Sequence, residues 1–225
     1  MALDVAKVKA IIFDIDGTLS DSDNQMAARL EKLFKPLSYL NASTPRIFSR
    51  WLIMALESPA NFIYKLADQI GIDNWFSRAL GTANRKKKPK RYSIVSGVPE
   101  MLATLSDHFP LAVVSARDEK TSFAFLDQFN LVKYFQAVIT SQTTLRTKPS
   151  PEPLIYAAEK IGIQKEYCLM VGDTTVDMRA AKSAGMQAVG VLCGFGREKE
   201  LKRSGADVIL PSTADLTDLL RISFQ

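Results

Sequence analysis

Two acidic residues stand directly after the first apolar run of the chain. Asp14 and Asp16 follow Ala10–Phe13, and Gly17 and Thr18 come next. If the backbone stays extended, side chains two positions apart point the same way, so the two carboxylates would lie close together. Like charges at that distance repel each other unless a divalent cation or a shared proton relieves them. This spacing favours a magnesium site, although an Asp-Gly turn at the end of a strand has the same sequence.

Polar residues of other types stand at comparable places further along the chain. Ser115 follows the second apolar run, Asp173 and Asp177 follow the fourth, and Lys148 precedes a predicted helix. Two carboxylates, a hydroxyl, a cation and a further acidic pair suit phosphoryl transfer, which needs charge stabilisation around the transferred group. Taken singly, the same residues are explained by a capping hydroxyl, a surface lysine and a helix N-cap.

Short apolar runs that alternate with helical patterns are expected to position these residues. The predicted strands are residues 10–13, 111–114, 137–140, 167–171, 188–192 and 208–210. The predicted helices between and after them are residues 99–108, 121–129, 153–161, 176–184 and 214–222. Strands separated by helices imply right-handed crossovers and a parallel sheet with helices on both faces, a doubly wound α/β fold. Ligands bind at the carboxyl ends of such strands, where most of these polar residues fall.

The segment between the first two predicted strands has a different character. Residues 20–92 contain helical periodicity interrupted by prolines and no strand-like run. We therefore expect a Rossmann-like catalytic core made of residues 1–19 and 93–225, with residues 20–92 inserted as an all-helical cap. Which residues of this cap would contact a substrate is left open by the sequence.

Four motifs stand in a fixed order along the chain. They are Asp14-Ile-Asp16-Gly17-Thr18-Leu19, then Ser115, then Lys148-Pro149, then Gly172-Asp173-Thr-Thr-Val-Asp177. In this order they resemble the haloacid dehalogenase superfamily. The downstream segments 180–186 and 206–209 also resemble its phosphoglycolate phosphatase-like branch. The resemblance covers residues 9–19 and most of residues 93–220. It implies a Mg²⁺-dependent phosphatase that hydrolyses a small-molecule phosphate monoester through an aspartyl-phosphate intermediate.

The resemblance also implies a role for each motif residue. Asp14 would be the nucleophile that attacks phosphorus. Asp16 would protonate the leaving group and then activate the hydrolytic water. Ser115 would donate a hydrogen bond to a phosphoryl oxygen, and Lys148 would offset negative charge.

The remaining implied roles are those of ligands. Magnesium would be bound by Asp14, Asp173 and the backbone carbonyl of Asp16, with Asp177 as a support or an additional ligand. The residues implied to bind the substrate are Gly17, Thr18, Ser115, Ala116 and Lys148.

Three functions remain open at this point. Within the superfamily, Asp16 argues for phosphate esters, because cleavage of a carbon–halogen bond needs no protonated leaving oxygen. A sugar phosphomutase would use the same residues, and a non-catalytic module would bind phosphate without turnover. The sequence does not indicate which phosphate ester is the substrate.

The composition is that of a soluble globular protein. The chain has 225 residues, of which 47% are hydrophobic and 24% are charged. No apolar run is long enough to span a bilayer, and acidic residues interrupt the N-terminal segment where a signal peptide needs apolar ones. We therefore expect a cytoplasmic protein that does not bind membranes.

The positive charge is concentrated in one part of the chain. The formal net charge is +5, and residues 20–92 hold 13 Lys and Arg against six Asp and Glu. The basic run at residues 85–91 has no interleaved aromatic residues, so we interpret it as a solvated connector and do not expect nucleic-acid binding. The expected partner is a small phosphorylated metabolite, and both a monomer and a homodimer remain open.

Other residues have structural interpretations. Cys168 and Cys193 lack the spacing of a metal site and are predicted to be buried free thiols. Gly194-Phe195-Gly196 lacks the third glycine of a dinucleotide fingerprint and is predicted to be a loop. Arg117, just past Ser115, could reach a substrate, but we interpret it as an exposed salt-bridge partner.

Overall fold

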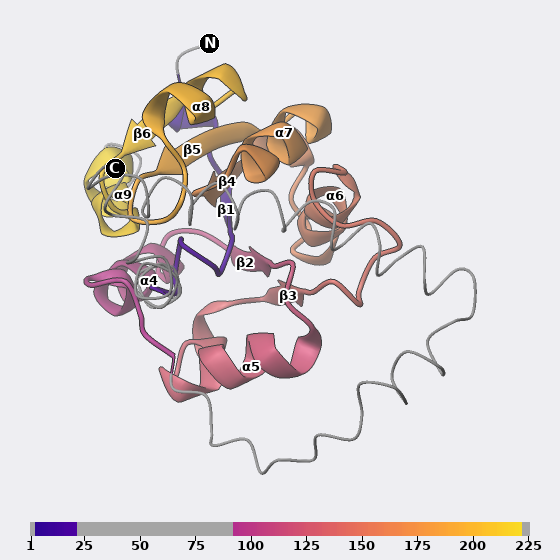
Figure 1. Ribbon diagram of the computed structural model, residues 1–225, viewed down its shortest axis with the longest axis vertical. Coiled ribbons are helices and arrows are strands. Elements are labelled where there is room, and N and C mark those ends of the chain that lie inside the picture. The colour runs from indigo at the N-terminus through magenta and orange to yellow at the C-terminus, as the bar shows by residue number, and fades with distance from the viewer. Residues whose placement is uncertain (1–2, 22–91, 222–225) are drawn as a thin grey trace, which may run out of the picture. The chain divides into compact units, whose positions relative to one another are not determined.

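The computed structural model describes residues 3–21 and 92–221 (Figure 1). The predicted helical cap, residues 20–92, lies outside the described residues except for its three end positions. The basic run at residues 85–91 also lies outside them. The predicted boundary between core and cap therefore stays a prediction.

The described residues form one sheet of six parallel strands. The strand order is β3-β2-β1-β4-β5-β6. The strands are β1 (Ala10–Phe13), β2 (Leu111–Val114), β3 (Ala137–Ile139), β4 (Cys168–Gly172), β5 (Gln187–Val191) and β6 (Val208–Leu210). This confirms the predicted doubly wound α/β fold. From β1 the chain passes to β2 and β3 on one side of β1 and then to β4, β5 and β6 on the other side. The strand order therefore reverses at β1.

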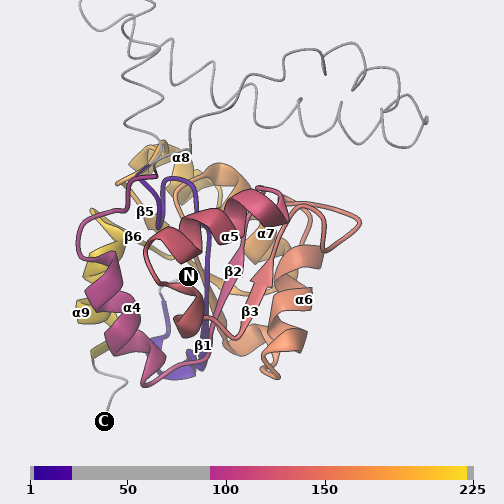
Figure 2. The same cartoon turned by 90° about the horizontal axis from the view of Figure 1, so that it is seen from below.

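Helices cover both faces of the sheet (Figure 2). Each face has its own hydrophobic cluster because side chains alternate along a strand. On β1, Ile11 and Phe13 pack with α4 (Val98–Ser106), α5 (Glu119–Gln128) and α9 (Leu216–Leu220). Ala10 and Ile12 pack on the other face with α6 (Glu152–Lys160), α7 (Thr175–Ala184) and α8 (Glu198–Arg203).

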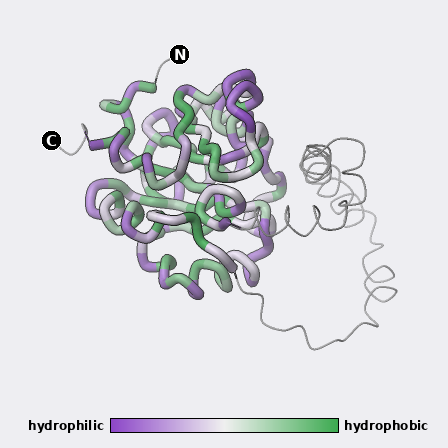
Figure 3. The backbone as a smooth tube through the Cα atoms, turned by 60° about the vertical axis from the view of Figure 1, so that its left-hand side comes forward, coloured by the Kyte–Doolittle hydropathy of each residue, from purple (hydrophilic) through white to green (hydrophobic). Residues whose placement is uncertain are grey.

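β1 is buried on both faces, as the uninterrupted apolar run predicts. Ile12 pairs with Ala112 on β2 and with Met170 on β4. The residues that follow β1 therefore start from a rigid position in the middle of the sheet. Figure 3 shows that hydrophobic and hydrophilic segments alternate along the described chain, as expected when buried strands alternate with polar turns.

The predicted elements differ from the observed ones mainly at their ends. Among the described residues there are four short 3-10 helices: η1 (Val5–Lys7), η3 (Val132–Tyr134), η4 (Lys165–Tyr167) and η5 (Thr213–Asp215). The predicted helix 214–222 begins with η5 and continues as α9. Helix α8 was not predicted, because its sequence is almost entirely charged and only Leu201 in it is buried. No helix in the described part of the chain has the length and apolar character to cross a membrane.

Candidate active site

Neighbouring strands bring the predicted site residues to one edge of the sheet. Asp14, Ser115 and Asp173 follow the adjacent strands β1, β2 and β4, whose parallel carboxyl ends lie side by side. Asp177 lies in the first turn of α7, and Lys148 precedes α6. Residues separated by up to 163 positions in the chain therefore meet at the switch point of the sheet.

Lys148 lies at the centre of this group. Its Nζ donates to Asp14 Oδ1 at 2.6 Å, to Asp177 Oδ1 at 2.7 Å and to the carbonyl of Val114 at 2.9 Å. These bonds use all three donors of an ammonium group. Burial alone would lower the pKa of Lys148, but Asp14 and Asp177 raise it above its ordinary value. Lys148 is therefore a fixed positive charge inside the site.

The backbone of Asp14 continues the hydrogen bonds between β1 and β4, because its N–H donates to the carbonyl of Val171 at 3.0 Å. Its side chain is buried. Burial raises the pKa of Asp14 to about 7, Lys148 opposes that rise, and the charges of Asp177 and Asp16 add to it. The protein thus holds this carboxylate in surroundings that oppose its ionisation unless more positive charge is present.

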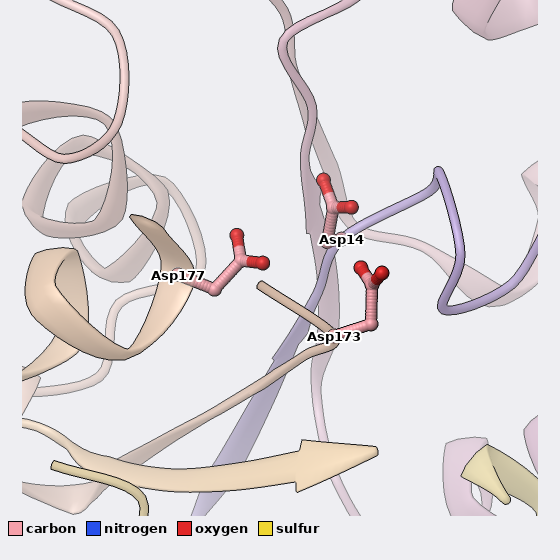
Figure 4. A group of neighbouring side chains, drawn as sticks. All are labelled: Asp14, Asp173 and Asp177. Carbon is pink, nitrogen blue, oxygen red and sulfur yellow. The ribbon is translucent and has the colours of Figure 1, made fainter. Parts of the chain in front are cut away.

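Three buried carboxylates point toward a common space (Figure 4). Asp14, Asp173 and Asp177 each offer a carboxylate oxygen, and these oxygens lie within 4.8 Å of one another. When all three carboxylates are ionised, they carry three negative charges, and the ammonium group of Lys148 offsets one of them. Two negative charges then remain in the cluster. A hard divalent cation with oxygen ligands would neutralise them, so this donor set fits such an ion.

Asp173 is held by groups from two loops. Its Oδ1 accepts a hydrogen bond from the Thr18 hydroxyl at 3.3 Å, and its Oδ2 accepts one from the backbone N–H of Phe195 at 2.9 Å. A Cβ on Gly194 would collide with Asp173 Oδ2, and a Cβ on Gly196 would collide with the carbonyl of Asp173. The close approach of this loop is therefore possible only with glycine at both positions.

The sequence analysis identified residues 194–196 as a loop but assigned them no function. The structure confirms a loop, and it brings the loop against the buried carboxylate of Asp173. A signal was present, because the Gly-x-Gly follows a predicted strand at the same edge of the sheet as the other motifs.

Asp177 has protein partners for both of its carboxylate oxygens. Oδ2 accepts hydrogen bonds from the N–H and the hydroxyl of Thr174, at 3.1 and 2.6 Å, in the capping box that begins α7. Oδ1 accepts from Lys148. Of the two predicted roles of Asp177, a support or an additional ligand, these contacts favour the supporting role. They also show that Asp177 binds Lys148, which in turn contacts Asp14.

Ser115 and Ala116 form the turn after β2. Ser115 is buried, its N–H donates to the carbonyl of Ile139 at 2.9 Å, and its Oγ accepts from the N–H of Arg117 at 3.1 Å. That bond uses a lone pair, so the hydroxyl proton remains available for a ligand oxygen. Ala116 is exposed beside it.

Gly17 and Thr18 turn the chain away from the sheet. Gly17 has a φ of 73°, a conformation that glycine adopts without strain, and its N–H donates to the carbonyl of Ser20 at 3.0 Å. The N–H of Thr18 donates to the carbonyl of Ile15 at 3.3 Å. Thr18 is buried, with its hydroxyl directed at Asp173, so a contact of either residue with a substrate stays a prediction.

Asp16 has a different environment from that of Asp14. Its side chain is 35% exposed, and its two carboxylate oxygens accept hydrogen bonds from Arg117, from Nε at 2.7 Å and from Nη2 at 2.5 Å. The prediction that Arg117 forms a salt bridge is confirmed, but the prediction that it is exposed is wrong. Its side chain is only 10% exposed, because the rings of Tyr92 and Phe125 lie beside the guanidinium.

The two cysteines are free, as predicted. Cys168 is buried in β4, and Cys193 is partly buried, with its Sγ 3.3 Å from the carbonyl oxygen of Gly17. Burial raises the pKa of both thiols, that of Cys168 to about 12. Both thiols are therefore protonated at neutral pH.

Comparisons with known proteins agree with the family resemblance of the motif residues. The family model for haloacid dehalogenase-like hydrolases matches residues 11–191. The chain is 30% identical over 217 residues to a phosphoglycolate phosphatase from Aquifex aeolicus, covering 95% of this chain and 97% of the relative. It is 29% identical over 223 residues to a phosphoglycolate phosphatase from Nitrosococcus oceani, covering 93% and 95%. A crystal structure of a HAD-superfamily hydrolase from Geobacter sulfurreducens is 25% identical, with a TM-score of 0.64, and the match covers 98% of this chain and 100% of that one.

Proposed function

The chain belongs to the haloacid dehalogenase-like hydrolases, and on this premise we propose that it is a Mg²⁺-dependent phosphatase. It would hydrolyse a small-molecule phosphate monoester through an aspartyl-phosphate on Asp14. The observation that carries the proposal is the buried cluster of Asp14, Lys148, Asp173 and Asp177, which has the groups that phosphoryl transfer needs and carries excess negative charge.

Asp14 is the nucleophile in this proposal. An oxygen of its carboxylate attacks phosphorus while the bond from phosphorus to the leaving oxygen breaks. Lys148 holds the Asp14 carboxylate at 2.6 Å and reduces the repulsion between it and the incoming phosphate. Asp177 and the carbonyl of Val114 fix Lys148 for this task.

Asp16 is the acid and the base. It donates a proton to the leaving oxygen in the first step and accepts one from the hydrolytic water in the second. Its partly exposed position at the end of the Asp-x-Asp motif suits both steps, because a group that exchanges protons with substrate and water needs to be accessible.

The phosphoryl oxygens would be bound by groups at the end of β2. We assign this task to the Ser115 hydroxyl and to the backbone N–H group of Ala116. Ser115 is placed for it because Arg117 occupies its oxygen as an acceptor and leaves its proton to donate. Lys148, whose three donors bind Asp14, Asp177 and Val114, contributes its positive charge.

Magnesium would be held by Asp14, Asp173 and the backbone carbonyl of Asp16. When bound, the ion neutralises charge on the phosphate and on the carboxylates around it. Thr18 and Phe195 hold the Asp173 carboxylate in place for this role. We further propose that residues 20–92 form the helical cap that selects the substrate.

Phosphoglycolate is the first substrate to test, because it gives the Aquifex aeolicus and Nitrosococcus oceani relatives their names. The experiment measures release of inorganic phosphate from 2-phosphoglycolate, an aryl phosphate and a panel of sugar phosphates, each with Mg²⁺ and with EDTA. We expect Asp14→Asn to lower turnover at least about 10⁴-fold, because no covalent intermediate can form.

Turnover by Asp14→Asn at the wild-type rate would refute the proposal. Isomerised sugar phosphate without net release of phosphate would instead identify a phosphomutase, and retention of phosphate without either product would identify a binding module.

A further inference from the structure

Arg117 is a charged side chain in contact with Asp16 that the mechanism above does not use. It comes from the turn after β2, two residues beyond Ser115, and reaches the loop after β1. Its Nε and Nη2 donate to the two different oxygens of Asp16 at 2.7 and 2.5 Å. Such parallel hydrogen bonds fix the plane of a carboxylate as well as its position.

The guanidinium itself lies in a fixed place. Its carbon is 5.1 Å from the ring centroid of Tyr92 and 5.3 Å from that of Phe125, distances typical of cation–π contacts. Its Nη2 also lies 3.4 Å from the Ser20 hydroxyl. Nη1 is buried and has no hydrogen-bond acceptor among the described residues. A side chain packed in this way can orient the group that it binds.

The pairing with Arg117 uses only part of the hydrogen-bonding capacity of the Asp16 carboxylate. A carboxylate has about four acceptor positions, and an arginine fork uses two of them. The Asp16 side chain is 35% exposed whereas that of Arg117 is 10% exposed, so the pair presents the carboxylate and not the guanidinium to the outside. An arginine remains protonated in proteins, so Arg117 neither takes a proton from Asp16 nor gives one to the leaving group.

We propose that Arg117 is a positioning residue that orients Asp16 for the hydrolysis of the aspartyl-phosphate. This inference rests on the proposed function. In that step a water oxygen forms a bond to phosphorus, and its proton passes to Asp16. The bond from phosphorus to Asp14 breaks, the Asp14 carboxylate is restored, and inorganic phosphate leaves. A fork of N–H donors matches the carboxylate form of Asp16, which is the form that accepts the proton.

The test separates formation of the intermediate from its hydrolysis. It uses p-nitrophenyl phosphate, whose leaving group needs no protonation, so formation of the intermediate does not depend on Asp16. For this substrate kcat/KM reports formation, whereas kcat reports hydrolysis once that step is the slow one. Steady-state rates and the pre-steady-state release of nitrophenolate are measured for the wild type, Arg117→Met, Arg117→Lys and Asp16→Asn.

We expect Arg117→Met to lower kcat by about 10- to 100-fold, part of the 10²- to 10⁴-fold that a general base contributes. kcat/KM should stay within about threefold of the wild type, so KM falls together with kcat. A burst of nitrophenolate approaching one equivalent per active site should precede the slow phase. Arg117→Lys, which keeps the charge but not the fork, should give an intermediate kcat, and Asp16→Asn should show the same pattern more strongly.

Arg203→Met, on the exposed surface of α8, serves as the matched control and should leave all these values unchanged. Arg117→Met with unchanged kcat overturns the inference. So does an equal loss of kcat and kcat/KM without a burst, which indicates a structural role alone. If Arg117→Met does not fold, Arg117→Lys decides by the same criteria.

The proposed function fails separately, and the inference with it, if the wild type releases no phosphate or if Asp16→Asn turns over at the wild-type rate.

Discussion

The two acids of the Asp-x-Asp motif are two residues apart, yet the structure gives them opposite surroundings. Asp14 is buried against Lys148 beside two further carboxylates, and burial raises its pKa to about 7. Asp16 is partly exposed and paired with the two-pronged guanidinium of Arg117. A covalent nucleophile needs a dry, rigid, charge-compensated place, whereas a group that exchanges protons with substrate and water needs access. Under the proposed function, burial and partner would thus give one residue type two different roles.

The largest effect is expected when the buried cluster around Asp14 loses the ammonium group of Lys148. Lys148→Met leaves Asp14 and Asp177 buried without their cation. Removing one partner of a buried ion pair costs about 3–5 kcal/mol of folding free energy. We expect a loss of that size in urea unfolding without metal, and at least a 10³-fold loss of turnover.

Lys202→Met is the control for Lys148→Met. Lys202 pairs with Glu198 on the surface of α8, where such pairs contribute little. Equal stability losses in the two variants would show that the buried cluster is not held by its charges.

A smaller effect is expected from a change at Gly194, whose backbone lies against the buried carboxylate of Asp173. Gly194→Ala would place a methyl group against Asp173 Oδ2, and the carboxylate must then move. Changes in groups that orient a metal ligand typically cost 10- to 100-fold in metal affinity. We expect a loss in this range when Mn²⁺ is titrated into the metal-free protein as a stand-in for Mg²⁺.

Gly190→Ala is the matched control, because its Cβ would meet Leu201 and not Asp173. It should lower stability and leave metal affinity unchanged. If Gly194→Ala binds Mn²⁺ as tightly as the wild type, the loop of residues 194–196 does not position Asp173 for the ion.

The smallest effect is expected in the pH dependence of stability, and it tests the buried position of Asp14 directly. Its pKa is raised from 3.8 to about 7 in the folded protein. The folded state therefore binds this proton more tightly than the unfolded state does. The proton on Asp14 therefore stabilises the folded state fully below about pH 4, and this stabilisation is lost as the pH rises through about 7.

In EDTA, the wild type should thus lose at least about 1 kcal/mol relative to Asp14→Asn between pH 4 and 8, or about 2–4 °C in Tm. Thermal unfolding of both proteins across this range measures the difference. Parallel Tm curves would contradict the raised pKa, and added Mg²⁺ should restore the wild type most at the high end of the range.

Much of the fold and the identity of the motif residues follow from local sequence. Short uninterrupted apolar runs predict buried strands, because a strand covered on both faces has no polar side to display. Asp14, Ser115, Lys148 and Asp173 were found because each stands next to such a run or to a predicted helix. These signals lie within a few residues of each other in the chain, so they can be read without knowing the fold.

Partners and burial were decided only by the tertiary structure. Sequence alone did not show that Lys148, and not the exposed Arg146, reaches Asp14, nor that Arg117 pairs with Asp16, 101 residues away. It also did not show that residues 194–196 hold Asp173. Each of these contacts joins loops that meet only because the strand order places their strands at one edge of the sheet. A side chain's charge environment depends on what packs around it, and that is set by long-range contacts that no local pattern contains.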